Sequence, residues 1–197
     1  MMNNITFTYN AESALAAGKS GFITESGAYV VTIQEAKYVT SSSGAESIEF
    51  SVEADDGRKA NYLNVYCKKK DGSPNQYGIN MIHAIMGCAD VGQLTTKMIN
   101  AHTHIAPELI NKRIGLILQK TLKTKTNGQD TYSFDILLPF VAQTRQTLEE
   151  KLKGLPPEII DKKFAKLHDK DERKNAPATY HQQYQSEYPG DDVFFSE

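Results

Sequence analysis

The chain has 197 residues, of which 40% are hydrophobic, and this length suits one domain of ordinary size with appended segments. Its 22 Lys and Arg are balanced by 24 Asp and Glu, so the net charge of −2 does not by itself indicate a polyanionic partner. The two cysteines, Cys67 and Cys88, are too few for a disulfide framework and have no CxxC spacing, which favours free thiols in a reducing cytoplasm.

The first part of the chain predicts three strands. Residues 1–26 are polar and small, and we expect a lead-in rather than a core element. Residues 27–39 are rich in β-branched and aromatic side chains, which predicts a strand. Residues 48–54 alternate between apolar and polar side chains, as is typical of a half-buried strand. A turn at residues 55–57 then leads into a returning strand over residues 59–67.

The second part predicts one helix and two further strands. Residues 76–87 have the period of a helix, which runs through Ile79, Ile82, His83 and Met86. Residues 89–107 mix apolar and turn residues, and we expect irregular or partly helical structure there. A buried strand over residues 111–124 and an alternating strand over residues 132–138 are joined by a turn that contains Asn127 and Gly128.

Three strands, a helix and two strands form the element order of the five-stranded Greek-key OB barrel, which binds oligonucleotides or oligosaccharides on one open face. The expected class is therefore all-β with a minor helix between strands 3 and 4, and the barrel domain spans residues 27–141. Residues 142–174 predict a polar linker with a helical extension that begins at Pro156 and Pro157. Residues 175–197 contain no Lys or Arg and few aliphatic side chains, so we expect a disordered tail.

The end of this tail combines acids with aromatic residues. Its informative positions are Asp191, Asp192, Phe194 and Phe195. Exposed aromatic side chains lower solubility, so their place beside acids at a chain end suits docking into an apolar pocket with a basic rim on a partner. The alternative is that the two phenylalanines fold back onto the barrel.

The chain resembles the single-stranded DNA-binding proteins of bacteria and bacteriophages, whose barrel is followed by a flexible linker and a short acidic tip that ends in or near phenylalanine. The features that carry the resemblance are the tip, the opening run of residues 27–33, the Ser43–Gly44 turn and the Asp56–Gly57 hairpin. The resemblance implies a protein without a cofactor that binds and protects single-stranded DNA with little regard to sequence, during phage replication or recombination in the host cytoplasm. The tip would recruit phage or host replication proteins, and a homodimer is compatible with this role.

Two basic stretches are candidates for the DNA-binding face, because a single strand exposes phosphates for cations and bases for flat side chains. The first contains Arg58, Lys59, Tyr62, Tyr66, Lys68, Lys69 and Lys70, in which the two tyrosines are four residues apart and share one side of a strand. The second contains Lys112, Arg113, Lys120, Lys123 and Lys125. The alternatives are core tyrosines beside a solvated loop, and lysines that protect an edge strand from aggregation.

Other chemistry has little support in the sequence. His102 and His104 would share a strand face and could bind a metal with His83 or Cys88, but no pair has the spacing of a structural zinc site. Glu49 and Glu53 suit a solvated strand face better than a catalytic pair. No nucleotide-binding or hydrolase motif is present, and no apolar run approaches the roughly 20 residues that cross a membrane. We therefore expect no enzyme and no membrane partner; the remaining alternative is an assembly module in which residues 156–174 mediate contacts.

Overall fold

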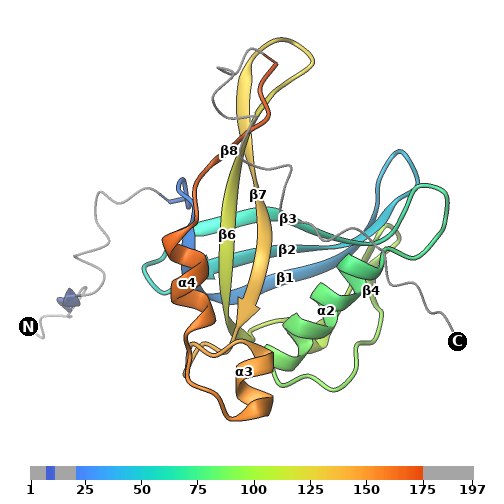
Figure 1. Cartoon of the computed structure of the whole chain (residues 1–197). Coiled ribbons are helices and arrows are strands. Elements are labelled where there is room, and N and C mark those ends of the chain that lie inside the picture. The colour runs from blue at the N-terminus through green and yellow to red at the C-terminus, as the bar shows by residue number, and fades with distance from the viewer. Residues whose placement is uncertain (1–7, 12–20, 175–197) are drawn as a thin grey trace, which may run out of the picture.

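The structure is a computed structural model that describes residues 8–11 and 21–174. The predicted acidic-aromatic tail, with Asp191, Asp192, Phe194 and Phe195, lies outside the described residues. The described part is mostly β, with a few short helices packed against the strands (Figure 1). Within it, no helix is long and apolar enough to cross a membrane.

The three strands expected in the first part of the chain are present. They are β1 (Gly27–Thr40), β2 (Glu46–Ala54) and β3 (Lys59–Lys68), and each is antiparallel to the next. The alternation predicted for β2 is confirmed, since Ile48, Phe50, Val52 and Ala54 are all buried in the main core. This alternation leaves the polar side chains of β2 on the opposite, outer side of the sheet.

The last two predicted strands are also present, as β6 (Arg113–Thr124) and β7 (Asp130–Phe140). The first half of β1 pairs with β6 as far as Leu118, which gives the strand order β3-β2-β1-β6-β7. Beyond Leu118 the hairpin continues away from β1–β3 as a long projection, residues 119–135, which we call the arm (Figure 1).

The sheet is open. β7 lies against β3, but no ladder of hydrogen bonds joins these two strands in the part of the chain that the structure describes. The mostly β class with a minor helix is therefore as predicted, whereas a closed five-stranded barrel of the OB type is not confirmed.

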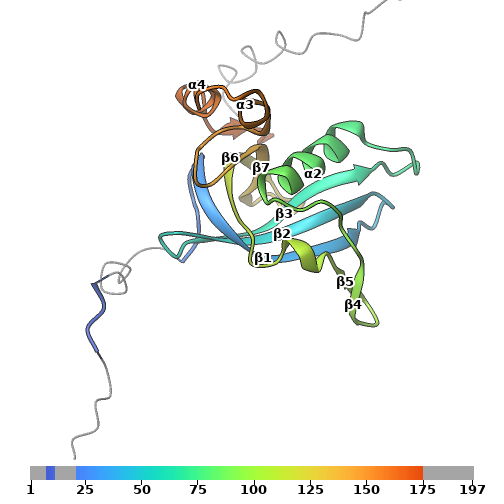
Figure 2. The ribbon, with the colours of Figure 1, turned by 90° about the horizontal axis from the view of Figure 1, so that it is seen from below.

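Residues 89–107 differ from the prediction. They contain a small hairpin, formed by β4 (Lys97–Asn100) and β5 (Thr103–Ile105), in place of irregular or partly helical structure. β5 pairs with Lys37 and Tyr38 of β1, so the hairpin extends the sheet beyond the end of β6, and a 3-10 turn (Pro107–Leu109) follows (Figure 2). Strands of three and four residues are too short to show a period of two in the sequence.

The helix α2 (Gln76–Cys88) is confirmed, but its buried face is offset from the predicted period. The buried residues are Gly78, Met81, Ile85 and Cys88, while His83 is exposed. A Cβ atom at Gly78 would lie 1.7 Å from the carbonyl oxygen of Tyr66, so the missing side chain lets the helix touch the backbone of β3. This close approach sets the rotation of the helix.

The lead-in contributes to the core, contrary to the prediction for residues 1–26. Ile23 is almost fully buried in the main core. Its N–H donates to the carbonyl of Lys59 at 2.8 Å, and the N–H of Lys59 donates to the carbonyl of Gly21 at 3.0 Å. One short parallel bridge leaves no periodic pattern, so the sequence could not show it.

Residues 142–174 pack against the sheet. They form α3 (Leu148–Lys153), α4 (Ile159–Ala165) and β8 (Lys170–Asp171), of which β8 pairs in parallel with the arm at Thr121 and Leu122. The helix expected to begin at Pro156 and Pro157 is present as α4, but it begins only at Ile159. The helix α3 was not predicted, since it lies in the stretch expected to be a polar linker. The side chains of Ile117, Phe140 and Ile160 are 0% exposed and form a second, small core.

Glu150 joins the two short helices. One carboxylate oxygen accepts hydrogen bonds from the N–H and the hydroxyl of Thr147, at 2.8 and 2.9 Å, which completes the capping box of α3. The other accepts from the N–H groups of Glu158 and Ile159, both at 2.8 Å, at the start of α4. Burial opposes ionisation of this buried carboxyl group, but the hydrogen bonds outweigh it and hold the pKa of Glu150 below its ordinary value.

Candidate nucleic-acid interface

The outward side chains of β1, β2 and β3 form a polar surface, which we call the open face. Across the strands, Lys37 of β1 stands opposite Glu49 of β2, which stands opposite Asn64 of β3. A hollow of about 540 Å³ lies on this face, with its lining drawn from all three strands. The polar and aromatic residues around it are Gln34, Glu35, Lys37, Glu49, Ser51, Glu53, Lys59, Asn61 and Tyr62.

A β-bulge in β3 shapes one wall of the hollow. Phe50 pairs with Leu63 and Val52 with Ala60, so one residue of β2 faces two residues of β3, Asn61 and Tyr62. Tyr62 has φ = 61°, in the left-handed region, which costs a bulky residue about 1–3 kcal/mol. In an uninterrupted strand Tyr62 would face away from Lys59 and Asn61, but the bulge brings all three to the hollow.

The two candidate tyrosines are surface residues. Tyr62 is 76% exposed and Tyr66 is 44% exposed, so the alternative of core tyrosines is wrong. Tyr62 and Tyr66 lie two residues before and two residues after Asn64, so all three side chains point to the outer side of β3. Two flat side chains are therefore available to a ligand on the open face.

The first basic stretch is divided between the two ends of β3. Arg58 and Lys59 lie where the strand begins, and Lys68, Lys69 and Lys70 lie where it ends, about 30 Å away for a strand of this length. Three of these cations pair with acids: Arg58 with Asp56 at 2.8 Å, Lys59 with Glu53 at 3.5 Å and Lys68 with Glu46 at 2.9 Å.

These ion pairs do not prevent the cations from binding phosphate. Exposed pairs contribute only about 0–1 kcal/mol, so a phosphate can compete with the carboxylate for the cation. The hydrogen bond to Glu46 raises the pKa of Lys68 above its ordinary value. Lys69 and Lys70 form no ion pair within residues 21–174, and they are the more available cations at this end of β3.

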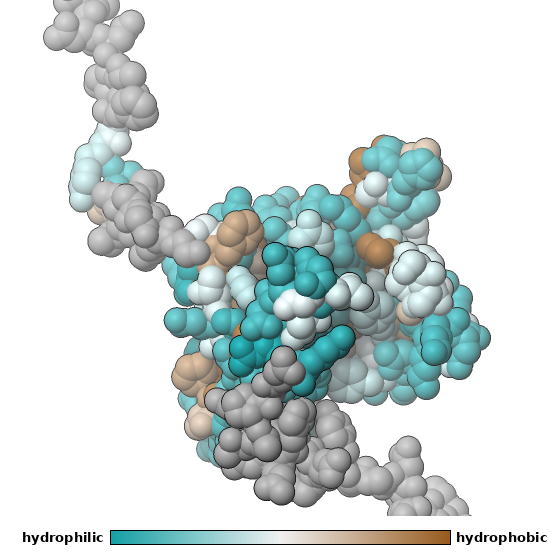
Figure 3. Space-filling view, turned by 90° about the horizontal axis from the view of Figure 1, so that it is seen from above, coloured by the Kyte–Doolittle hydropathy of each residue, from teal (hydrophilic) through white to brown (hydrophobic). Residues whose placement is uncertain are grey.

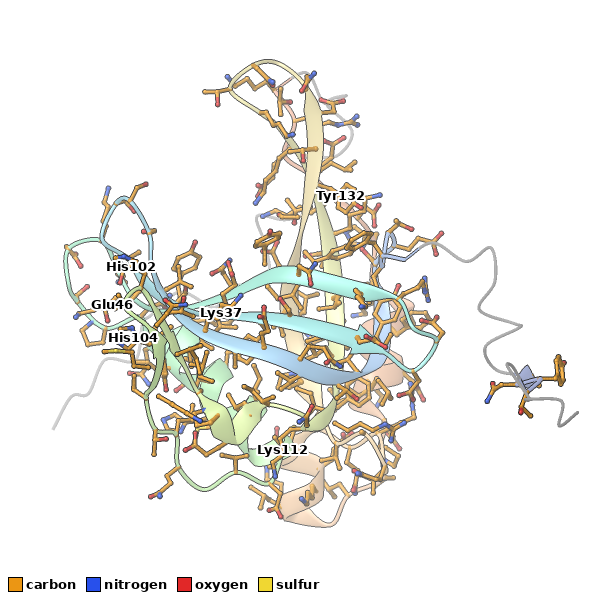
Figure 4. All side chains as sticks on the ribbon, turned by 180° about the vertical axis from the view of Figure 1, so that it is seen from behind. Lys37, Glu46, His102, His104, Lys112 and Tyr132 are labelled. Atoms are coloured by element: carbon orange, nitrogen blue, oxygen red, sulfur yellow. The ribbon has the colours of Figure 1, made fainter. Side chains whose placement is uncertain are left out.

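The second basic stretch is also divided. Lys112 and Arg113 lie at the beginning of β6, far from the arm (Figure 4), and Arg113 pairs with Asp55 at 2.5 Å. Lys120, Lys123 and Lys125 belong to the arm and its turn. The structure therefore does not bring the five residues together as one patch.

The sequence did not single out Tyr132, an aromatic residue of the arm. Its ring is half-exposed, lies 4.8 Å from Lys120 Nζ and packs edge-on against Phe134 at 5.7 Å. Figure 4 shows Tyr132 beyond the edge of β3, in the same view in which Lys37 lies over the three strands. The alternation through Tyr132, Phe134 and Ile136 predicts a strand with one side facing the core. The pattern does not indicate that Tyr132 lies outside the core while Ile136 is buried in it.

The histidines and cysteines do not form a second site. His102 lies in the turn between β4 and β5, whereas His104 lies in β5 opposite Tyr38. The prediction that the two histidines share a strand face is therefore wrong. Among the described residues, no three His, Cys, Asp or Glu side chains are placed to hold a metal ion. Cys67 and Cys88 are free thiols, and burial raises the pKa of Cys88 to about 11.

No protein-family model matches the chain, and a search of curated proteins finds no similar sequence. Seen from the end of the arm, the surface of the molecule is mostly hydrophilic with small, separate hydrophobic spots (Figure 3). The open face, with its hollow and exposed tyrosines, is the strongest candidate site.

Proposed function

We propose that this protein binds single-stranded DNA on the open face, without enzymatic activity, in phage DNA replication or recombination. One observation carries the proposal: the β-bulge holds Tyr62 in a strained conformation that contributes no burial and exposes its ring beside a hollow. Strain of this kind persists where the surrounding structure imposes it, and it is concentrated at functional sites.

The topology supports an OB-type barrel as the scaffold for this activity. The order β1-β2-β3-α2-β6-β7, with β7 lying against β3, has the sequence of elements of that fold once β4 and β5 are treated as an insertion. OB barrels are partly open and bind oligonucleotides on the face of their second and third strands and on the loop between the last two. In this chain these regions correspond to the open face and the arm.

The exposed side chains suit a ligand of variable sequence. Every base has a π-face, so stacking on Tyr62, Tyr66 or Tyr132 tolerates any sequence. Lys69 and Lys70 at the end of β3, and Lys123 and Lys125 on the arm, form no ion pair among the described residues and can contact phosphates. Replication or recombination proteins recruited by Asp191, Asp192, Phe194 and Phe195 complete the proposed role.

A fluorescence titration with an oligo-dT strand at low and high salt tests this proposal. Affinity should fall steeply as salt rises, because neutralising phosphates releases counterions from the strand. Tyr62→Leu should weaken binding at both salt concentrations. Absence of binding at low salt by the full chain would overturn the proposal.

An assembly module is the second candidate function. Leu152 and Phe164, on α3 and α4, are large apolar side chains that are more than half exposed. If assembly is the function, the wild-type protein should self-associate as its concentration rises, and the double substitution of Leu152 and Phe164 by serine should prevent this. Sedimentation velocity of the two proteins at several concentrations distinguishes this role from DNA binding.

A further inference from the structure

Three carboxylates line the hollow, and Glu49 differs from the other two. Glu35 pairs with Lys37 at 2.7 Å, and Glu53 pairs with Lys59 at 3.5 Å. Glu49 forms no ion pair within the described residues, although Lys37 stands opposite it in the sheet. Its side chain accepts one hydrogen bond there, from Asn64 Nδ2 at 3.3 Å, and most of its acceptor capacity is free.

Asn64 fixes the position of Glu49 relative to Tyr62. The hydroxyl of Ser47, which is only 3% exposed, donates to Asn64 Oδ1 at 2.9 Å and so orients the amide. The amide nitrogen then donates both to the carbonyl of Tyr62 at 3.1 Å and to Glu49. The carboxylate is thus tied to the same residue whose ring stands beside the hollow.

Glu49 also lies between the two exposed tyrosines along the sheet. Ser47 faces Tyr66, Glu49 faces Asn64, and the bulge with Tyr62 comes next along β3. A base stacked on either ring would therefore have an edge within reach of the row that contains Glu49 and Asn64.

We propose that Glu49 makes the open face selective for bases that carry an exocyclic amino group, and for guanine above all. This inference rests on the proposed DNA binding and names the ligand chemistry of the same site. An ionised carboxylate only accepts hydrogen bonds. Guanine offers it two donors side by side, N1–H and the N2 amine, and such bidentate, charge-assisted pairs are strong. Cytosine and adenine offer one amine, whereas the single N–H of thymine lies between two carbonyl oxygens that repel a carboxylate.

The same charge determines where the DNA backbone runs. Phosphates are repelled by Glu49, so a bound strand should direct its bases into the hollow and its phosphates toward Lys69 and Lys70 at the end of β3 or toward the arm. Base edges on the protein and phosphates at the rim are the arrangement typical of single-strand recognition.

The experiment compares an alternating dG-dT oligonucleotide with its dI-dT counterpart, in lithium buffer to prevent guanine quartets. Inosine differs from guanosine only by the missing amino group. The full-length wild type should bind the guanine strand at least about fivefold more tightly, the smallest effect expected of a good base contact. Glu49→Gln should reduce this ratio to about twofold or less and should raise affinity for oligo-dT, because a negative charge that repels phosphates and thymine carbonyl oxygens is removed.

Glu53→Gln is the matched control, since Glu53 lies on the same strand and face but is paired with Lys59. This variant should retain the preference for guanine. Equal binding of the two strands by the wild type, or loss of the preference to the same extent in both variants, would overturn the role of Glu49 while leaving DNA binding intact. Failure of the wild type to bind any of the three oligonucleotides would instead overturn the proposed function and, with it, this inference.

Discussion

The outward side chains of β1 have different surroundings in the two halves of the strand. In its first half the outward side chains Ala28 and Val30 are apolar and pack on the small core that contains Ile160 of α4. In its second half the outward side chains Gln34 and Lys37 are polar and line the hollow of the open face. The first half is covered by helices, and the second half is left to solvent.

The outward side chains of these two regions contribute differently to stability. The covered face gains stability from burial and from the four hydrogen bonds that Glu150 accepts. The open face carries the strained Tyr62, whose exposed ring returns little stability. Strain at an exposed aromatic residue is expected where a ligand binds, so the difference supports the proposal that the open face is the binding face.

Ile160→Ala should produce the largest effect, on the covered face. Removing a fully buried isoleucine costs about 2–5 kcal/mol, through lost burial and the cavity that remains. Urea unfolding monitored by circular dichroism measures the loss. Phe164→Ala is the control on the same helix, since Phe164 is 52% exposed and should cost less than about 1 kcal/mol. Similar losses in both variants would show that α4 is not anchored by Ile160.

Glu150→Gln should destabilise the fold by on the order of 2 kcal/mol at pH 7, because a charged acceptor of backbone N–H groups is lost. The folded-state pKa of Glu150 is lowered, so its contribution is fully present above the unfolded pKa of about 4.3 and is lost as pH falls through the folded pKa. The stability difference between wild type and variant, measured by urea unfolding, should therefore shrink as pH falls below about 4. A difference that stays constant to pH 2 would contradict this account.

Tyr62→Leu should weaken binding to single-stranded DNA by about 1–3 kcal/mol, the contribution of one stacked base. Tyr62→Gly should weaken binding as well but should not lower the thermal midpoint, because glycine adopts φ = 61° without a steric cost. Tyr77→Leu provides the control, since Tyr77 is an exposed tyrosine on α2, away from the hollow. Normal DNA binding by both Tyr62 variants would remove Tyr62 from the interface.

Replacing Lys69 and Lys70 by alanine should weaken binding to all sequences alike. The slope of log affinity against log salt should become less steep by about 0.7 for each lost phosphate contact. Lys68→Ala should have a smaller effect, because Lys68 already interacts with Glu46. An unchanged slope in the double variant would move the phosphate contacts to Lys123 and Lys125 on the arm.

Deletion of residues 190–197 should have the smallest effect on the folded domain. It removes Asp191, Asp192 and Glu197, and we expect a modest rise in affinity for DNA at low salt because acids that compete with phosphates are lost. The rise should disappear at high salt, where screening shortens the range of charges. A lower thermal midpoint after deletion would show that Phe194 and Phe195 pack into the domain.

The sequence predicts the elements whose side chains follow a repeating pattern over many residues. β2 and the hairpin of β6 and β7 were visible because alternation over many residues reports a face that is buried on one side. Ile23 was missed because its burial depends on a single pair of bridge bonds to Lys59. Short strands such as β4 and β5 also contain too few residues to show a repeating pattern.

The sequence predicts which types of residue form the candidate site better than it predicts how they are arranged in space. Tyr62 and Tyr66 share a face as expected, but the bulge that brings Lys59 to the same hollow changes the register by one residue, and no motif marks it. The basic stretches were contiguous in sequence and are separated in space, because an extended strand moves its ends far apart. Pairing of Arg58, Lys59 and Lys68 with acids depends on contacts that composition cannot show.

The bulge in β3 also affects how the molecule meets copies of itself. β3 is an edge strand, and a regular edge is a template for pairing with the same strand of another molecule. The chain occupies this edge at both ends, through the bridges from Phe22 to Lys59 and from Lys68 to Pro74, and the bulge interrupts the regular pattern between them. The same bulge that exposes Tyr62 on the open face therefore also makes the adjoining edge of β3 a poor template for pairing with another copy.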